Sequence, residues 1–191
     1  MTFHVIPISE QITEKVRRTM VSPQYPSLPA FSSVANGYGP CRSCLGTFDE
    51  GNDYRTSFTY DPVEGILDLS QPGPVFIHSA KCERYAGNAF PEGLRGIPMY
   101  FEAFDSIGSL LHRVRAEIGT EGSQINSLFA DENVEFLHIR NAEAGCFIAR
   151  VEKGEFTVTK ATSKFRKGFC QSETFSVFSA YQQIHSSSKL S

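Results

Sequence analysis

The sequence lacks several features that would assign a function class at once. It has no tryptophan and no apolar run near the roughly 18 residues that a membrane-spanning helix requires. Its formal net charge of −3 lacks the basic surplus that is typical of sequence-independent nucleic-acid binding. It contains no glycine-rich phosphate loop, no Gly-x-Ser-x-Gly and no His-Glu-x-x-His motif. We therefore expect neither a membrane protein nor a nucleic-acid-binding protein.

The cysteines are also sparse, and this bears on the compartment. There are five, an odd number, spaced unlike those of a secreted disulfide scaffold. Residues 1–7 show no basic segment leading into an apolar stretch, so we expect no signal or transit peptide. These features favour a cytoplasmic protein, in which cysteines are free thiols, metal ligands or reactive centres.

Two pairs of side chains carry the clearest chemical signal. Cys41 and Cys44 are separated by two residues. His78 and Cys82 are separated by three, and this combination of spacings is typical of a tetrahedral zinc site. We expect Gly46 to permit the tight backbone in which amide groups hydrogen-bond to a thiolate. The sequence thus predicts a structural zinc with four ligands: Cys41, Cys44, His78 and Cys82.

Two other interpretations of these residues stay open. The cysteines can be reduced thiols near a loop, with the histidine hydrogen-bonded at the end of a strand. A redox role for the first cysteine pair is less favoured, because thioredoxin-like motifs begin a helix after a strand. Here the pair follows a glycine-proline loop instead.

Alternation of apolar and polar residues predicts that strands dominate the fold. Strands are expected at residues 54–60, 75–78, 99–104, 134–140 and 146–151. Residues 110–118 fit a strand or a helix, and the turn signal before them favours the strand of a hairpin. Prolines and glycines over residues 22–40 exclude regular structure there and indicate a long loop.

Two helices complete the expected fold. One covers residues 9–20 with Ser9 as its N-cap, and the other follows Thr120 as N-cap. The whole predicts an α+β fold, with a mainly antiparallel sheet and a few helices packed on one face. We expect a single domain over residues 1–152 and a partly disordered C-terminal extension over residues 153–191.

Several short segments follow one another in a distinctive order. They are Pro40-Cys41-Arg42 with Leu45, Tyr60-Asp61-Pro62, Gly73-Pro74-Val75-Phe76-Ile77-His78, Phe101-Glu102-Ala103-Phe104-Asp105, His138-Ile139-Arg140-Asn141-Ala142 and Gly145-Cys146-Phe147. This order resembles the bacterial family catalogued as domain of unknown function 1203, over roughly residues 1–152. The resemblance implies a single domain, and it brings no activity that can be transferred.

The expected hairpin of residues 134–151 is a second candidate site. If Arg140 faces Cys146 across the loop, one face carries Phe136, His138, Arg140, Cys146, Ile148 and Arg150. The other face, expected to pack on the core, carries Leu137, Ile139, Phe147, Ala149 and Val151. The first face gathers guanidinium groups that can bind a carboxylate or phosphate. The ligand-binding candidates are His138, Arg140, Asn141, Cys146 and Arg150.

Two hypotheses about function follow. The first is a cytoplasmic binding or interaction protein, without enzymatic activity, that carries a structural zinc site. The second is a small-anion-binding module, or a cysteine-dependent enzyme in which His138 acts as base for Cys146, on the outer face of the hairpin. A solvated outer face without a function is the simpler interpretation of that hairpin. The sequence leaves the partner unknown, and the second hypothesis implies a small anionic ligand.

Overall fold

The computed structural model describes residues 2–64 and 71–154. The predicted C-terminal extension lies outside the described residues from position 155 onward. The elements, in chain order, are β1 (Phe3–Ile6), α1 (Glu10–Thr19), β2 (Phe31–Val34), β3 (Tyr54–Tyr60), β4 (Gly73–His78), a 3-10 turn (Glu92–Leu94), β5 (Met99–Phe104), β6 (Leu110–Arg115), α2 (Glu121–Leu128), β7 (Phe136–Asn141) and β8 (Phe147–Lys153).

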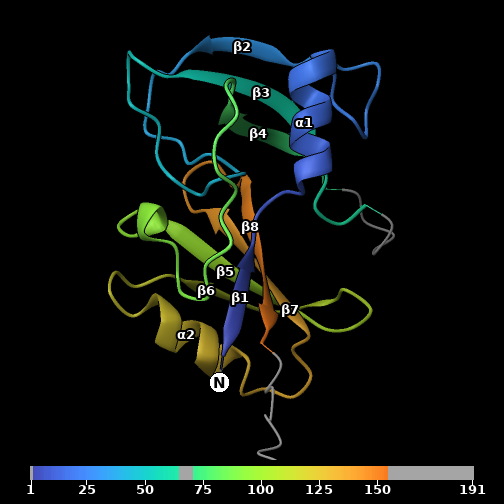
Figure 1. Ribbon diagram of the computed structural model, residues 1–191. Coiled ribbons are helices and arrows are strands. Elements are labelled where there is room, and N and C mark those ends of the chain that lie inside the picture. The colour runs from blue at the N-terminus through green and yellow to red at the C-terminus, as the bar shows by residue number, and fades with distance from the viewer. Residues whose placement is uncertain (1, 65–70, 155–191) are drawn as a thin grey trace, which may run out of the picture. The chain divides into compact units, whose positions relative to one another are not determined.

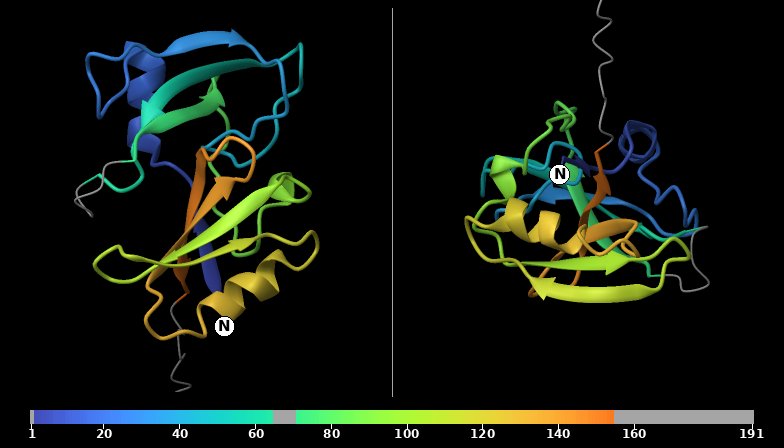
Figure 2. Two further views of the ribbon diagram at one scale, coloured as in Figure 1. Left: turned by 180° about the vertical axis from the view of Figure 1, so that it is seen from behind. Right: turned by 90° about the horizontal axis from the view of Figure 1, so that it is seen from below.

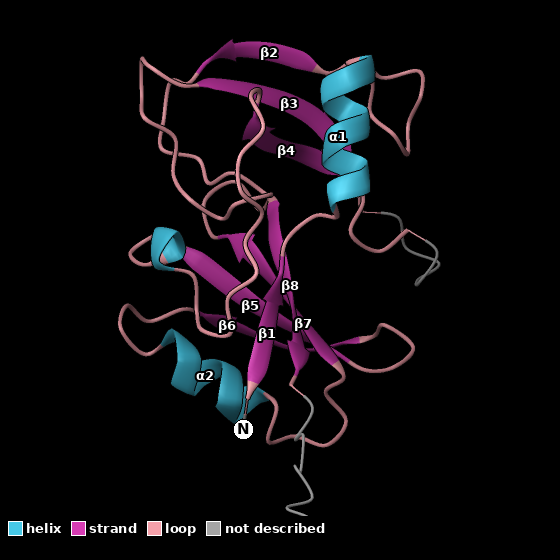
Figure 3. Cartoon of the chain, viewed as in Figure 1, coloured by secondary structure: helices cyan, strands magenta, loops and turns pink. Residues whose placement is uncertain are grey.

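The strands form two antiparallel sheets (Figures 1 and 3). One has five strands in the order β1-β8-β7-β5-β6, and the other has three in the order β2-β3-β4. The α+β class and the dominance of antiparallel sheet are therefore confirmed. The sequence predicted one sheet, whereas the strands form two. Strands β2, β3 and β4 pair only with one another within the described part of the chain.

Each sheet has its own helix and its own apolar core. Helix α2 lies on one face of the five-stranded sheet, as Figure 2 shows from behind and from below, and its Ile125 packs into a core with Phe101 and Leu137. Helix α1 lies along the three-stranded sheet, and its Val16 packs into a second core with Ile77. The two cores are separate clusters of buried residues. The segments that connect the two sheets can therefore carry polar and metal-ligating side chains.

Helix α1 forms where its caps allow. Ser9 is its N-cap, and the side-chain oxygen of Ser9 accepts a hydrogen bond from the amide of Ile12 at 3.4 Å. Arg17 and Arg18 occupy its last turn, where cations complement the helix dipole. Thr120 stands at the N-cap of α2 as expected, yet its hydroxyl donates to the Glu117 carbonyl and makes no cap.

Most of the expected strands are confirmed, and two strands of the structure, β1 and β2, were not expected. The strands expected at residues 54–60 and 99–104 have the same bounds in the structure, and residues 110–115 form a strand paired with β5. The expectation of an irregular segment over residues 22–40 is wrong for β2, which pairs with β3. All four residues of β2 are exposed. Neither face of this strand is buried, so its sequence lacks the alternation of apolar and polar residues that identifies a half-buried strand.

The register of the β7–β8 hairpin also differs from expectation. His138 faces Arg150 and Phe136 faces Glu152, and a β-bulge between Ile139 and Arg140 shifts the ladder. Arg140 faces Phe147, where Cys146 was expected; without the bulge, the pairing of His138 with Arg150 would place Ile148 opposite Arg140. Two assignments were therefore wrong. The side chain of Ile148 lies in the core of the five-stranded sheet. Phe147 lies in the core of the three-stranded sheet.

Candidate metal centre

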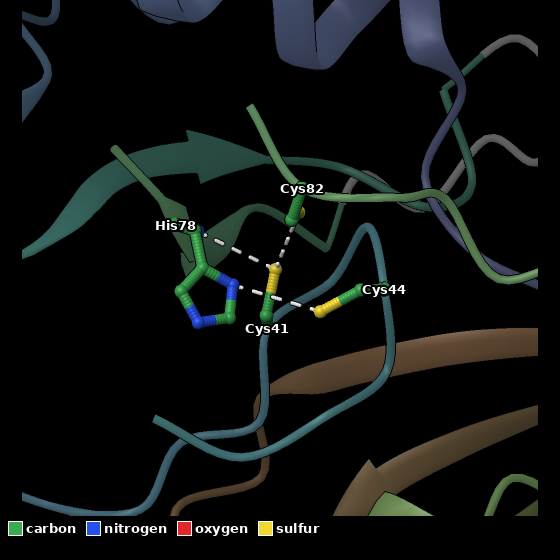
Figure 4. Close-up of side chains that lie close together, drawn as sticks. All are labelled: Cys41, Cys44, His78 and Cys82. Carbon is green, nitrogen blue, oxygen red and sulfur yellow. Dashed lines mark hydrogen bonds between the residues drawn. The ribbon is translucent and has the colours of Figure 1, made fainter. Parts of the chain in front are cut away.

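Four side chains from two distant segments converge at the end of β4 (Figure 4). Their ligand atoms all lie within 4.8 Å of one another, and they belong to Cys41, Cys44, His78 and Cys82. Cys41 is fully buried, and the other three are partly exposed. The spacing in the sequence predicts that these side chains meet, and the structure brings them together. That they hold zinc stays a prediction.

The separations between donor atoms suit a tetrahedral ion. The Sγ atoms of Cys41 and Cys82 lie 3.9 Å apart, and Cys44 Sγ lies 3.6 Å from His78 Nδ1. With Zn–S near 2.3 Å and Zn–N near 2.0 Å, a tetrahedral site places its donors about 3.5–3.8 Å apart. A disulfide requires sulfurs at about 2.05 Å. The three cysteines are free thiols, and with His78 they form a cluster that could hold a metal ion.

The first cysteine pair sits on a tight turn. The Leu45 amide donates to the Cys41 carbonyl at 2.9 Å, and the Cys41 amide donates to the Gly46 carbonyl at 2.9 Å. The residue in the left-handed region is Leu45, with φ of 57°. Leu45, which is buried, therefore takes the left-handed conformation of the turn, and the expected hydrogen bond between an amide and a cysteine sulfur is present between Gly46 and Cys44. The leucine side chain anchors the turn in the core of the five-stranded sheet.

Backbone hydrogen bonds fix this turn to its neighbours. The Arg42 amide donates to the Phe76 carbonyl of β4 at 2.8 Å, and the Ile8 amide donates to the Arg42 carbonyl at 3.0 Å. The Tyr85 amide, beyond Cys82, donates to the Ser43 carbonyl at 3.0 Å. The turn is thus held between β4, the segment leading into α1 and the segment that follows Cys82. The site is positioned by main-chain contacts and not only by side-chain packing.

Amide groups and a carboxylate surround the ligand atoms. The amides of Ser43 and His78 donate to the sulfur of Cys41, at 3.5 and 3.4 Å. On the far side of the imidazole, His78 Nε2 lies 3.3 Å from a carboxylate oxygen of Asp53. A carboxylate on the second ring nitrogen orients a metal-binding histidine and raises its basicity. Nδ1 is thereby left to face the three sulfurs.

Helix α1 contributes a cation to the same cluster. Arg17 donates from Nε to the His78 carbonyl at 3.0 Å and from a terminal amino group to the sulfur of Cys82 at 3.6 Å. A guanidinium beside a thiolate offsets part of the negative charge that three sulfurs bring together. The contact also ties the last turn of the helix to the end of β4.

The cluster shifts the pKa values of its own members. Hydrogen bonds from Cys44 and Cys82 hold the pKa of the Cys41 thiol far below its usual range. Hydrogen bonds with Cys41 and Cys82 raise the pKa of His78 to about 10. Both shifts favour a thiolate at Cys41 beside an imidazolium at His78. Metal binding requires a neutral imidazole, so it must release that proton.

The side chain of Arg42 links the cysteine turn to the five-stranded sheet. Arg42 is 2% exposed, and its Nε donates to the Phe147 carbonyl of β8 at 2.8 Å. A second bond reaches the Pro40 carbonyl. Desolvation by burial lowers the pKa of Arg42 to about 10, which still leaves the guanidinium charged at neutral pH. The candidate metal site and β8 are therefore mechanically connected.

A comparison with models of known families identifies the family of this chain. The family model described as "Protein of unknown function (DUF1203)" matches residues 38–153, which is more than half of the 191 residues. The chain belongs to this family. The match confirms the resemblance seen in the sequence, and it begins at residue 38 where the resemblance was expected to begin near residue 1. All four candidate ligands lie inside the matched range, whereas Arg17 lies outside it. No curated protein and no solved structure matches the chain.

The structure separates the candidates of the hairpin face. Arg140 is paired with Glu102, Nε to carboxylate oxygen at 2.6 Å, and it also donates to Gln71 and to the Gly145 carbonyl. Asn141 accepts from the amides of the 143–144 loop. The face is not a solvated outer surface, because every residue of β7 is buried. Arg140 and Asn141 are thus engaged in holding the hairpin.

The remaining candidates lie in two different places. Cys146 is partly exposed, its Sγ donates to the Ala144 carbonyl at 3.7 Å, and it borders a cavity with Arg140. His138 is fully buried among phenylalanine rings and, with Arg150, borders a second cavity. The imidazole and the Cys146 thiol are therefore not brought together as a nucleophile and its base.

Several residues of the site gave no signal in the sequence. Asp53, Arg17 and Arg42 reach the cluster from a loop, a helix and the inside of the cysteine turn. An aspartate and two arginines are common on surfaces, so nothing in the sequence separates them from solvated charges. No helix within residues 2–64 and 71–154 has the length and apolar character needed to cross a membrane.

Proposed function

We propose that this protein binds one zinc ion through Cys41, Cys44, His78 and Cys82, and that the ion is structural. The observation that carries the proposal is the convergence of four ligand atoms within 4.8 Å from segments far apart in the sequence. Three thiolates and one imidazole form a set that soft-ligand chemistry assigns to zinc ahead of magnesium or calcium.

A structural role fits the number of protein ligands. A catalytic zinc keeps a coordination position for water or substrate, whereas four protein ligands fill the tetrahedron. The ion would join the turn at Cys41 to the end of β4 and, through Arg17, to helix α1. These elements surround the small three-stranded sheet, whose core is completed by the buried sulfur of Cys41. The zinc would therefore support the half of the protein with the smaller sheet.

We infer that the protein acts as a binding or interaction protein and not as an enzyme. The site uses its reactive thiols as ligands, and the second cysteine candidate, Cys146, has no base beside it in the described residues. Thiolate ligands require a reducing environment, which favours the cytoplasm as the compartment.

Metal content of the purified chain tests the proposal directly. Elemental analysis should find about one equivalent of zinc per chain. Replacement by cobalt should give the intense visible absorption of a tetrahedral thiolate site, and Cys44→Ser should weaken or remove it. Cys146→Ser is the matched control, because Cys146 is also a partly exposed free thiol. Zinc below a tenth of an equivalent that added metal does not raise would refute the proposal.

A further inference from the structure

A second cavity, of about 210 Å³, lies where the chain passes from β1 into α1. It is bordered by Ser9 at the N-cap of α1, by Tyr60 at the end of β3, and by three further polar side chains. Those are Arg84, His138 and Arg150. Ligand cavities for drug-sized molecules measure about 300–1,000 Å³, so this one suits a smaller ligand.

His138 is the most unusual residue of this cavity. The residue is 0% exposed, and neither ring nitrogen has a hydrogen-bond partner among the described residues. Its ring lies about 5 Å from those of Phe104, Phe136 and Phe147, at centroid distances of 5.0, 5.2 and 5.1 Å. A phenylalanine would serve such packing without burying polar atoms. Buried polar groups are nearly always paired, so the two ring nitrogens call for a partner.

Two arginines supply positive charge at the same cavity. Arg150 is held by its stack on Phe136, 3.7 Å from guanidinium carbon to ring centroid, and by a bond from Nε to Glu152 at 2.7 Å. Arg84 donates from Nε and one terminal nitrogen to the carbonyls of Ile8 and Pro7. Each guanidinium therefore has terminal N–H groups without a partner in the described residues. Fixed guanidiniums with free donors are well suited to bind oxyanions.

The beginning of α1 adds to this field. The helix has ten residues, and its N-terminal amides carry partial positive charge at the edge where Ser9 borders the cavity. Burial, followed by the charges of Arg140 and Arg150, lowers the pKa of His138 to about 3. The imidazole is neutral at neutral pH, and both of its ring nitrogens are buried behind the wall of the cavity. Three carboxylates oppose the positive charge of this cavity. Glu152 is paired with the Arg150 Nε. Asp61 and Glu64 lie near Tyr60, whose pKa is raised by burial and then by these two charges.

We infer that this cavity binds a small molecule carrying a carboxylate or phosphate group, held by Arg84 and Arg150 beside the buried ring of His138. The inference does not rest on the zinc proposal, because none of the four candidate metal ligands borders the cavity. It also differs from the expected site on the hairpin face, because Arg140 and Cys146 border the other cavity.

Titration of the full chain with inorganic phosphate and, separately, acetate tests the inference. The imidazole ¹⁵N signals report on His138, with sodium chloride added to keep ionic strength constant. We expect a saturable shift of the His138 signals with at least one of the two anions. Arg84→Ala and Arg150→Ala should each weaken binding by about tenfold or more, since a charge-assisted hydrogen bond is lost.

Two control variants make the outcome decisive. Arg113 also stacks on an aromatic ring, at 4.5 Å from Tyr100, and pairs with a glutamate, yet it does not border the cavity. Arg113→Ala should leave the affinity unchanged. His138→Phe should fold and remove the imidazole signals assigned to His138, which confirms that those signals report on this cavity. A shift that chloride reproduces, equal weakening by Arg113→Ala, or His138 signals that respond to neither anion would each overturn the inference.

Discussion

Removal of one thiolate from the candidate metal centre should destabilise the protein far more than removal of an equivalent thiol elsewhere. Cys44→Ser is the sharpest substitution, because Cys44 is partly exposed and a serine there leaves no large buried cavity. Cys41 is a poorer choice, since its sulfur is buried in the core of the three-stranded sheet and its loss would mix two effects.

The size of the effect follows from the chain that the metal closes. Cys41 and Cys82 are separated by 41 positions along the chain. A link that closes a loop of this length lowers the conformational entropy of the unfolded chain, which stabilises the folded state by about 4 kcal/mol. Metal at about a thousand times its dissociation constant stabilises the folded state by about 4 kcal/mol. The two figures describe one effect and are not added. For a protein of this size they correspond to a fall in Tm of about 8–16 °C.

Thermal unfolding with and without a chelator measures this. The zinc-loaded wild-type chain should lose about 8–16 °C in EDTA. Without a chelator, Cys44→Ser should unfold near the Tm that the wild-type chain has in EDTA. Adding EDTA should change the Tm of this variant little. Cys146→Ser should unfold within about 2 °C of wild type and keep the full response, because its thiol makes one weak hydrogen bond. If EDTA leaves the wild-type Tm unchanged and both serine variants unfold together, the metal has no structural role.

Three further outcomes are expected. Asp53→Asn should weaken zinc affinity by about 10-fold or more in chelator competition, because the carboxylate beside His78 Nε2 orients the ring; an unchanged affinity would contradict this. Arg42→Met should cost about 2–4 kcal/mol in urea unfolding, because it leaves the Phe147 carbonyl unpaired in a buried position; a loss below about 1 kcal/mol would show that water replaces it. Finally, the pKa of His138 is lowered from 6.5 to about 3, so its contribution is present above pH 6.5 and lost as the unfolded chain takes up a proton on acidification. Between pH 7 and pH 4.5 wild type should lose about 2–3 kcal/mol more than His138→Phe, and parallel stability curves would refute the shift.

Local patterns predicted much of the fold because they report burial on one chain segment at a time. Half-buried strands such as Gly73–His78 carry side-chain periodicity, and the cap of α1 at Ser9 is a local hydrogen bond. Strand β2 has four exposed residues and no such pattern. Its place is decided by pairing with β3, which is a contact between segments that the sequence separates.

The hairpin of β7 and β8 shows where local reasoning fails. Alternation correctly assigned Leu137 and Ile139 to the core, but a bulge at Arg140 exchanged the faces of Phe147 and Ile148. A one-residue slip moves side chains to the opposite face of a sheet, so register cannot be read from composition. The consequence is chemical, since it sets His138 beside Phe147 and away from the thiol of Cys146.

The sequence by itself determined which residues are suited to bind a metal, since ligand type and spacing are local properties of Cys41–Cys44 and His78–Cys82. It also determined the family and the α+β class. Only the tertiary structure decided that these two pairs meet, that Asp53 and Arg17 reach the same point, and that a buried imidazole borders a cavity with two arginines. The chemistry of a side chain follows from its residue type. Whether distant side chains meet depends on backbone pairing between segments far apart in the sequence, and no local pattern reports that pairing.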